Sequence, residues 1–423
     1  MKALFGVALI SGLLTLLRIG CGFLVAKLVA VYTGPTGMAM VGQVQSLASA
    51  LGGIVSAPAG AGVVRYTAQS ELQGAAACAP WWTASLRWIL GILAVAVPAA
   101  LLFSTAIATA LLDDSSYAVV VVIAALVLPL VAANALVASV LNGQQQYRLF
   151  IGLSAAAVLV STAITVVLTA LYGLPGALLA AALFGAISGI VMLVGVARQP
   201  WMRMRFWWAD CERGHLAGIG KYVAMALTTA VCGPVGLILV RTILADNVGW
   251  ERTGLWQAVY KVSEVYLGVL TVSLSTFFLP RLSSLRDPDA VQREVFSVAR
   301  IVVPVAVGLA VGVYLLRDLV ILLLFSEQFI AARDLFAIQL IGDVLKIASW
   351  LFAYPMLSTG AARWFISTEV GFSLAFVTLA LLLVPEIGEK GAVMAYAVTY
   401  GAYFLVVFTN RRRFIRGSSD TAT

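Results

Sequence analysis

Charge is scarce in this sequence. Only 11% of the 423 residues are charged, while 62% are hydrophobic, and the mean hydropathy is +1.01. A soluble domain carries about 25% charged residues. This composition excludes an ordinary water-soluble enzyme, and such a high apolar content also excludes a disordered chain. The sequence therefore predicts a multi-spanning membrane protein.

Residues that hold metals or cofactors are also few. The chain has one histidine, His215, and four cysteines, Cys21, Cys78, Cys211 and Cys232. No two cysteines have the spacing of metal ligands. We expect the cysteines to be small apolar side chains in the interior, and we expect no metal site and no cofactor.

Long apolar runs fill most of the chain. A spanning helix needs about 20 apolar residues, and turn residues and charge clusters divide these runs. The runs predict twelve helices near 4–31, 38–64, 82–107, 117–141, 149–172, 175–197, 218–244, 254–280, 297–316, 333–358, 364–384 and 390–410. The predicted fold class is an all-α integral membrane protein with twelve transmembrane helices.

Basic residues are distributed unevenly over the predicted loops. With a cytoplasmic N-terminus, 18 lysines and arginines fall on the inner side and 5 on the outer side. By the positive-inside rule, we expect both termini in the cytoplasm. The net charge of +8 follows from this topology, so we do not expect nucleic acid as a partner.

The two halves of the chain share spaced glycine motifs. Motifs that begin at Gly173 and Gly388 open helices six and twelve, while Thr36-Gly37 and Thr253-Gly254 open helices two and eight. The two pairs have nearly equal separations along the chain, each close to half its length. Six spans per half predict parallel repeats about an axis along the membrane normal, with a site between the two lobes.

The predicted organisation has four segments. It comprises an N-terminal six-helix lobe over 1–197, a cytoplasmic or interfacial linker over 198–217, a C-terminal six-helix lobe over 218–416 and a cytoplasmic tail over 417–423. The linker contains Trp201, Trp207 and Trp208 among arginines, a composition that suits the headgroup layer.

Two polar stripes lie inside otherwise apolar helices. Gln257, Lys261 and Glu264 have the spacing i, i+4, i+7 in helix eight; in helix ten, Gln339, Asp343 and Lys346 repeat it. Both stripes fall near the bilayer midplane, where each charge costs about 2.5–3.5 kcal/mol. Each stripe is either a self-neutralising salt bridge or the polar wall of a cavity.

Other basic residues are candidates for binding an anion. Arg18 lies halfway along helix one with no acid three or four residues away, so its partner comes from another helix or from an anionic ligand. Lys27, near the outer end, either binds substrate or reaches the headgroups. Arg65 and Arg241 lie at helix ends and suggest a basic rim at each mouth. Glu369, also inside a span, is expected to have a structural partner.

Several stretches resemble a known family. They are GLWQAVYKVSEVYL at 254–267, FLPRLSSL at 278–285, RDLFAIQLIGDVLK at 333–346, RIGCG at 18–22, GPTG at 34–37 and RYTAQ at 65–69. They resemble the bacterial O-antigen flippases. The chain is most similar to the enterobacterial common antigen (lipid III) branch, within the multidrug/oligosaccharidyl-lipid/polysaccharide exporter superfamily. The likeness covers nearly the whole chain.

The resemblance implies both a fold and an activity. It implies two six-helix lobes around a cationic cavity in the bacterial inner membrane. It further implies alternating-access transfer of an undecaprenyl-pyrophosphate-linked oligosaccharide from the inner to the outer leaflet. Membrane lipids, a polysaccharide polymerase and its chain-length machinery are the implied partners.

The resemblance also assigns residues. Arg18, Arg65, Arg241, Asp343 and Lys346 match the family pattern; the basic members are expected to meet the pyrophosphate. Glu264 falls where the family has an acid, whereas Lys261 falls at a variable position. Physical reasoning agrees, because guanidinium groups bind phosphate oxygens in a bidentate manner. Asp343 or Glu264 could couple transport to a proton or sodium ion, although their spacing fits a plain salt bridge equally well.

Two other functions remain open. A drug or small-cation antiporter of the same superfamily would need an acidic cavity, but the seven deep charges are four basic and three acidic. A membrane glycan-polymerising enzyme would need an acidic metal-binding motif or a catalytic base. Asp113-Asp114 and Asp287-Pro-Asp289 fit solvated loops better, so we do not expect an enzyme.

Overall fold

The described part of the chain is almost entirely helical. The computed structural model describes residues 2–285, 287–359 and 361–416, and no β-strand occurs within them. Arg286 and the predicted tail, 417–423, lie outside the described residues. The helical fold class follows from the sequence, because a chain in hydrocarbon must pair its backbone groups internally.

Contacts divide the chain into two compact units. Unit 1 comprises Met1–Tyr32 and Met40–Ile238, and unit 2 comprises Thr33–Ala39 and Leu239–Thr423. The short segment 33–39 thus packs with the second half of the chain. The predicted lobe boundaries at 197 and 218 describe the sequence repeat, whereas these two units are defined by contacts. The lobe boundaries therefore stay a prediction.

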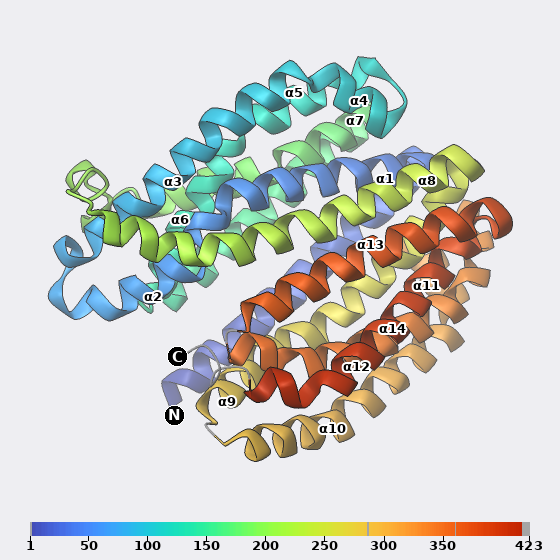
Figure 1. Ribbon diagram of the computed structural model, residues 1–423. Helices are drawn as coiled ribbons and strands as arrows, with labels where there is room; N and C mark the ends of the chain where they lie inside the picture. The colour runs from blue at the N-terminus through green and yellow to red at the C-terminus, as the bar shows by residue number, and fades with distance from the viewer. Residues whose placement is uncertain (1, 286, 360, 417–423) are drawn as a thin grey trace. The chain divides into compact units, whose positions relative to one another are not determined.

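Unit 1 is built from the first helices of the chain (Figure 1). They are α1 (Lys2–Ser56), α2 (Ala61–Ser70), α3 (Ala75–Leu102), α4 (Ser104–Leu112), α5 (Ala118–Leu126), α6 (Leu128–Gly143), α7 (Tyr147–Val196) and the first part of α8 (Arg213–Ser273). α2 packs against α6, and α6 packs along α7.

Unit 2 contains the remainder of α8 and the helices that follow it. They are α9 (Leu279–Ser284), α10 (Pro288–Leu315), α11 (Arg317–Leu324), α12 (Phe336–Ser358), α13 (Ala362–Ile387) and α14 (Glu389–Arg416). A π-helical turn, Leu274–Phe278, joins α8 to α9, and a 3-10 helix, Glu327–Leu335, precedes α12.

Three of the helices are broken within their length. The described residues contain nine helices that are long and apolar enough to cross a membrane. α1, α7 and α8 are each interrupted by non-helical backbone, at Gly34, Gly173 and Gly249 respectively. Counting each broken helix as two segments gives twelve segments among the described residues, which is consistent with the twelve predicted spans.

The positions of these breaks repeat along the chain. Gly34 (φ 64°) and Gly249 (φ 80°) have the same separation in sequence as Gly173 (φ 60°) and Gly388 (φ 65°). Their ψ values lie near ±130° to ±170°, a backbone region that is essentially restricted to glycine. The same rare conformation at the same offset supports the predicted parallel repeat.

Close backbone packing repeats with the same period. A Cβ on Gly176 would overlap the carbonyl group of Leu168, and a Cβ on Gly391 would overlap that of Leu383. These two contacts are separated along the sequence by the same number of residues as the paired breaks. Each glycine thus lets the helix after a break approach the helix before it.

Several predicted helices are shorter than expected. The predicted span 38–64 is interrupted by a 3-10 turn containing Pro58, and 117–141 is divided before Pro129. Proline lacks the N–H that would continue the helical hydrogen bonds, which explains these two breaks. The span 82–107 is divided at Phe103, whose ψ of 12° departs from helical geometry.

Two tryptophans of the linker lie in the core of unit 1. Trp201 and Trp207 are 3% and 8% exposed and pack against Trp82. The position of the linker in the headgroup layer stays a prediction. Trp208 is 59% exposed. Burying large aromatic surfaces anchors the linker to α3.

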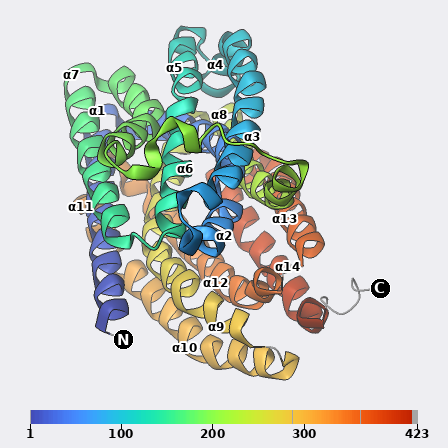
Figure 2. The same cartoon turned by 90° about the vertical axis from the view of Figure 1, so that its left-hand side faces the viewer.

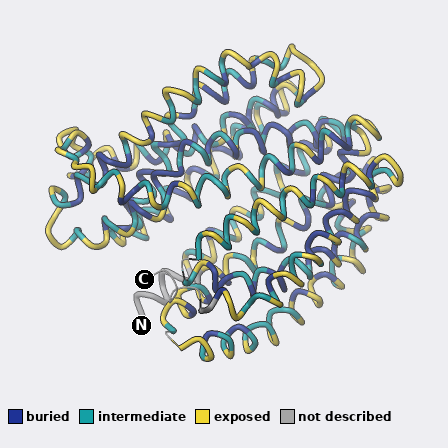
Figure 3. The backbone as a smooth tube through the Cα atoms, in the orientation of Figure 1, coloured by how far each residue is buried: buried dark blue, intermediate teal, exposed yellow. Residues whose placement is uncertain are grey.

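α12 is the most enclosed helix of unit 2. It runs alongside α14, and α10 packs against it as well (Figure 1, Figure 2). Figure 3 shows exposed residues recurring along α10, whereas α12 is mostly buried. Ile347 and Leu351 of α12 are completely buried in the core of unit 2. Polar side chains on α12 are therefore fixed by their neighbours.

We expect Gly249→Ala to destabilise the protein, because alanine in this conformation costs about 1–3 kcal/mol. The apparent Tm of the purified protein in detergent should fall. Gly268→Ala is the matched control in the same helix, since no atom lies within 4 Å of its added Cβ. Equal Tm values for Gly249→Ala and the wild type would contradict the proposed role of this glycine.

Candidate functional site

The polar stripes of α8 and α12 belong to the same unit. Six of the nine predicted site residues lie in unit 2: Arg241, Lys261, Glu264, Gln339, Asp343 and Lys346. Arg18, Lys27 and Arg65 lie in unit 1. Within unit 2, α8 and α14 each contribute a tyrosine, Tyr266 and Tyr396, to a polar network around Asp343 of the α12 stripe.

Asp343 is enclosed by hydrogen-bond donors. Its carboxylate accepts hydrogen bonds from the Tyr266 hydroxyl at 2.8 Å, the Tyr396 hydroxyl at 3.0 Å and Gln339 Nε2 at 3.2 Å. Asp343 and Gln339 are both completely buried. A buried carboxylate is tolerated only where donors replace its water, and three helices supply those donors here.

The close approach of α14 to α12 depends on a glycine. A Cβ on Gly342 would lie 2.5 Å from Tyr396 Cδ1, so the tyrosine ring packs directly on the backbone beside Asp343. Ser349 Oγ also donates a hydrogen bond to the Tyr400 carbonyl at 3.2 Å. Both contacts hold the tyrosines of α14 over the polar face of α12.

Lys346 is surrounded by aromatic rings. Its ammonium lies 5.0 Å from the centre of the Trp350 ring, 5.7 Å from that of Tyr400 and 6.0 Å from that of Tyr396. Aromatic faces attract a cation without neutralising it. The rings therefore position the Lys346 side chain without supplying a counter-charge.

The acids around Lys346 act at a distance. Asp343, Glu264 and Glu369 contribute to its electrostatic environment, but no described carboxylate lies within ion-pair distance of its ammonium. Asp343 is instead engaged by neutral donors. The polar stripe of α12 is thus not a closed salt bridge.

The polar stripe of α8 differs from that of α12. Lys261 Nζ and Glu264 Oε2 form an ion pair at 2.7 Å, as the salt-bridge interpretation expects. The Glu264 side chain is 54% exposed, and that of Lys261 is 26% exposed. These two charges therefore neutralise each other at an accessible position.

Arg241 is held in place because α8 turns back on itself at Gly249. Arg241 and Gln257 lie eight residues on either side of the break at Gly249, so the break turns the two segments toward each other. Arg241 Nε donates a hydrogen bond to Gln257 Oε1 at 2.7 Å, and both residues are buried. Its guanidinium also lies 5.8 Å from the centre of the Trp256 ring.

The unit 1 candidates are more accessible. Arg18 is exposed on α1 and makes no hydrogen bond or ion pair with the described residues. Lys27 is half-buried. Arg65 Nη1 donates a hydrogen bond to the Tyr222 hydroxyl at 2.8 Å. This hydrogen bond joins Arg65 of α2 to α8 within unit 1.

The aromatic members of the network were missed by the sequence analysis. These side chains are uncharged and lie in apolar spans, where aromatic residues usually pack in the core. They are Tyr266, Tyr396, Tyr400 and Trp350. The i, i+4, i+7 spacing of Tyr396, Tyr400 and Tyr403 was a usable signal, because it places three hydroxyls on one face of a helix.

Comparison of the sequence with known proteins gives a consistent result. The pattern of the family described as "Polysaccharide biosynthesis protein" matches residues 44–334. The chain is 33% identical over 394 residues to the lipid III flippase of Escherichia coli (strain K12) and equally to that of Shigella flexneri. Each match covers 92% of this chain and 94% of the relative.

Solved structures share the fold at low sequence identity. A multidrug resistance MATE family transporter of the MOP superfamily, in its inward-facing conformation, has a TM-score of 0.76 and 13% identity, over 97% of this chain and 100% of that one. An outward-facing conformation gives a TM-score of 0.68 at 14% identity, over 98% and 96% respectively. The relatives and neighbours are flippases and transporters rather than enzymes. The family pattern and the chain-long identity show that this chain belongs to the polysaccharide biosynthesis protein family and is a relative of the lipid III flippases.

Proposed function

We propose that this protein is a flippase that moves an undecaprenyl-pyrophosphate-linked oligosaccharide from the inner to the outer leaflet of the bacterial inner membrane. The observation that carries the proposal is its 33% identity to lipid III flippases along nearly its whole length. The similarity to the multidrug transporter, at 13% identity, concerns the fold alone.

The chemistry of unit 2 supports an anionic substrate. A pyrophosphate diester carries two negative charges, which cannot enter hydrocarbon without compensation. Lys346 offers an ammonium group that forms no ion pair with a described carboxylate. Arg241, and Arg18 in unit 1, offer planar donors that match phosphate oxygens. A cationic drug would instead favour an unpaired acid, whereas Asp343 is already engaged by three donors.

Transport would proceed by alternating access. Repeated breaks at Gly34, Gly173, Gly249 and Gly388 give each half of the chain the same pair of turning points, a feature that suits rocking of one half against the other. Asp343 or Glu264 would bind the coupling ion, a proton or sodium. The distribution of basic residues supports cytoplasmic termini. A polysaccharide polymerase and its chain-length machinery would use the product.

The experiment that tests this function is reconstitution of the purified protein in liposomes. Fluorescently labelled undecaprenyl-pyrophosphate glycan would be placed in both leaflets, and an impermeant quencher would report its transfer, with and without a pH or sodium gradient. Transfer of the glycan lipid but not of a cationic dye supports the proposal. Transfer of the dye alone, or formation of a polymer from the labelled lipid, would contradict it.

We expect Lys346→Gln to slow transfer roughly 10- to 150-fold, because a hydrogen bond to a charged group is worth about 1.5–3 kcal/mol. Arg18→Gln should act in the same way. Lys390→Gln, an exposed lysine of the same unit, is the matched control and should leave the rate unchanged. Normal transfer by both Lys346→Gln and Arg18→Gln, each verified to be folded by its Tm, would exclude these residues from the site.

Lys261→Gln should be milder, because Glu264 already neutralises Lys261 in a partly exposed ion pair. Such pairs contribute up to about 1 kcal/mol, so we expect a rate no more than about fivefold lower. The same quenching assay measures it. Complete loss of transfer would show that Lys261, rather than Lys346, holds the phosphate.

A further inference from the structure

A basic groove lies in unit 2 away from the polar network of α8, α12 and α14. It has a volume of about 510 Å³ and is lined by the first turns of α10, from Asp289 to Arg300, together with Arg412 near the end of α14. Three arginines line it: Arg293, Arg300 and Arg412. We refer to it as the α10–α14 groove.

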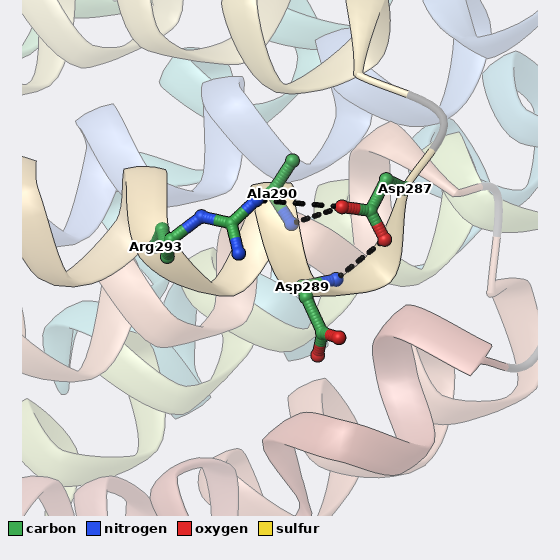
Figure 4. A network of polar contacts seen from close by, with 4 residues as sticks. All are labelled: Asp287, Asp289, Ala290 and Arg293. Carbon is green, nitrogen blue, oxygen red and sulfur yellow. Dashed lines mark hydrogen bonds and ion pairs between the residues drawn. The ribbon is translucent and has the colours of Figure 1, made fainter.

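The start of α10 fixes one side of the groove (Figure 4). The Asp287 carboxylate caps the helix by accepting hydrogen bonds from the backbone N–H groups of Asp289 and Ala290, both at 3.1 Å. Arg293 Nη2 lies 3.5 Å from Asp287 Oδ2. The charge of Arg293 is therefore partly compensated, and its guanidinium is held beside the helix terminus.

The charges of the other two arginines are not paired with any residue in the described part of the chain. Arg300 and Arg412 are exposed, and neither makes a hydrogen bond or an ion pair with a described residue. Arg412 lies in the last turns of α14, where the helix dipole favours a positive charge. Together they present ten guanidinium N–H donors with no protein acceptor, a donor set suited to phosphate oxygens.

An apolar wall adjoins these charges. The Arg411 guanidinium lies 4.3 Å from the centre of the Phe408 ring and 5.8 Å from that of Phe296, which lines the groove. Arg411 Nη1 also donates a hydrogen bond to the Phe408 carbonyl. The groove thus combines a cationic side with an aromatic side.

The groove lies where the polar part of α10 meets its apolar part. Charged residues end at Arg300, and the helix continues with an apolar run whose outer face is exposed, including Ile301 at 67% and Val305 at 46%. These apolar side chains are accommodated by hydrocarbon. A ligand in the groove would therefore have its phosphate among the arginines and its acyl chains along α10, which favours a lipid over a soluble anion.

We propose that the α10–α14 groove binds the phosphate headgroup of an anionic phospholipid, of the phosphatidylglycerol or cardiolipin class. Basic pockets between membrane helices bind such headgroups through the same donors. This lipid would be a resident component of the protein rather than its transported substrate. The site is separate from Lys346 and does not depend on the proposed transport function.

The test is native mass spectrometry of the full-length protein in detergent, titrated with tetraoleoyl cardiolipin. The double variant Arg300→Gln/Arg412→Gln should lower the affinity about thirtyfold, and phosphatidylethanolamine should bind weakly to both proteins. Arg148→Gln/Arg198→Gln is the matched control, since it removes two exposed arginines outside the groove. The Tm of each variant, measured in lipid-free detergent, verifies that it is folded.

Each outcome decides the proposal. A selective loss in the groove variant supports it. Equal cardiolipin affinity in the groove variant and the wild type, or an equal loss in the control variant, would overturn it. Inorganic pyrophosphate or glycerol phosphate that displaces cardiolipin at micromolar concentration would overturn it as well, by showing that the groove binds a soluble anion. The assay contains no lipid-linked glycan, so failure here leaves the proposed transport unaffected.

Discussion

The central interaction in this protein is the contact between the Lys346 ammonium and the aromatic rings around it. A lone charge in an apolar span is expensive, and proteins usually pair it with an opposite charge. Here the obvious partner of Lys346, Asp343, is occupied by Tyr266, Tyr396 and Gln339. The rings of Trp350 and Tyr400 lie beside the ammonium and supply no counter-charge. In the proposed function, an anionic ligand supplies it.

The fold provides this arrangement through glycine. Gly249 turns α8 back so that Arg241 reaches Gln257. Gly342 lets the Tyr396 ring lie on the backbone of α12, where its hydroxyl reaches Asp343. The breaks recur at a constant offset along the chain, so the architecture of each half follows from the same backbone requirement. The described contacts of the polar network all lie within unit 2, and its geometry is therefore set by that unit.

Much of the fold was predictable, because the solvent imposes it. Long apolar runs must become helices in hydrocarbon, and the paired Gly173 and Gly388 indicated the repeat. The site was predictable in its charged members and in the glutamines of the two stripes, but not in its aromatic members. Which partner Asp343 takes depends on how α14 packs against α12, and that packing rests on uncharged tyrosines and on Gly342. The burial of Trp201 and Trp207 was missed for a similar reason: a tryptophan beside arginines suits a headgroup layer and a core equally well.

The most direct test of the central claim is the equilibrium binding of heptaprenyl pyrophosphate to the purified protein and to Lys346→Gln, measured by isothermal titration calorimetry. If the uncompensated ammonium holds the phosphate, the variant should bind at least roughly tenfold more weakly, while Lys390→Gln binds as the wild type does. Equal affinity in Lys346→Gln and the wild type would show that the phosphate is bound elsewhere, and the account would be wrong.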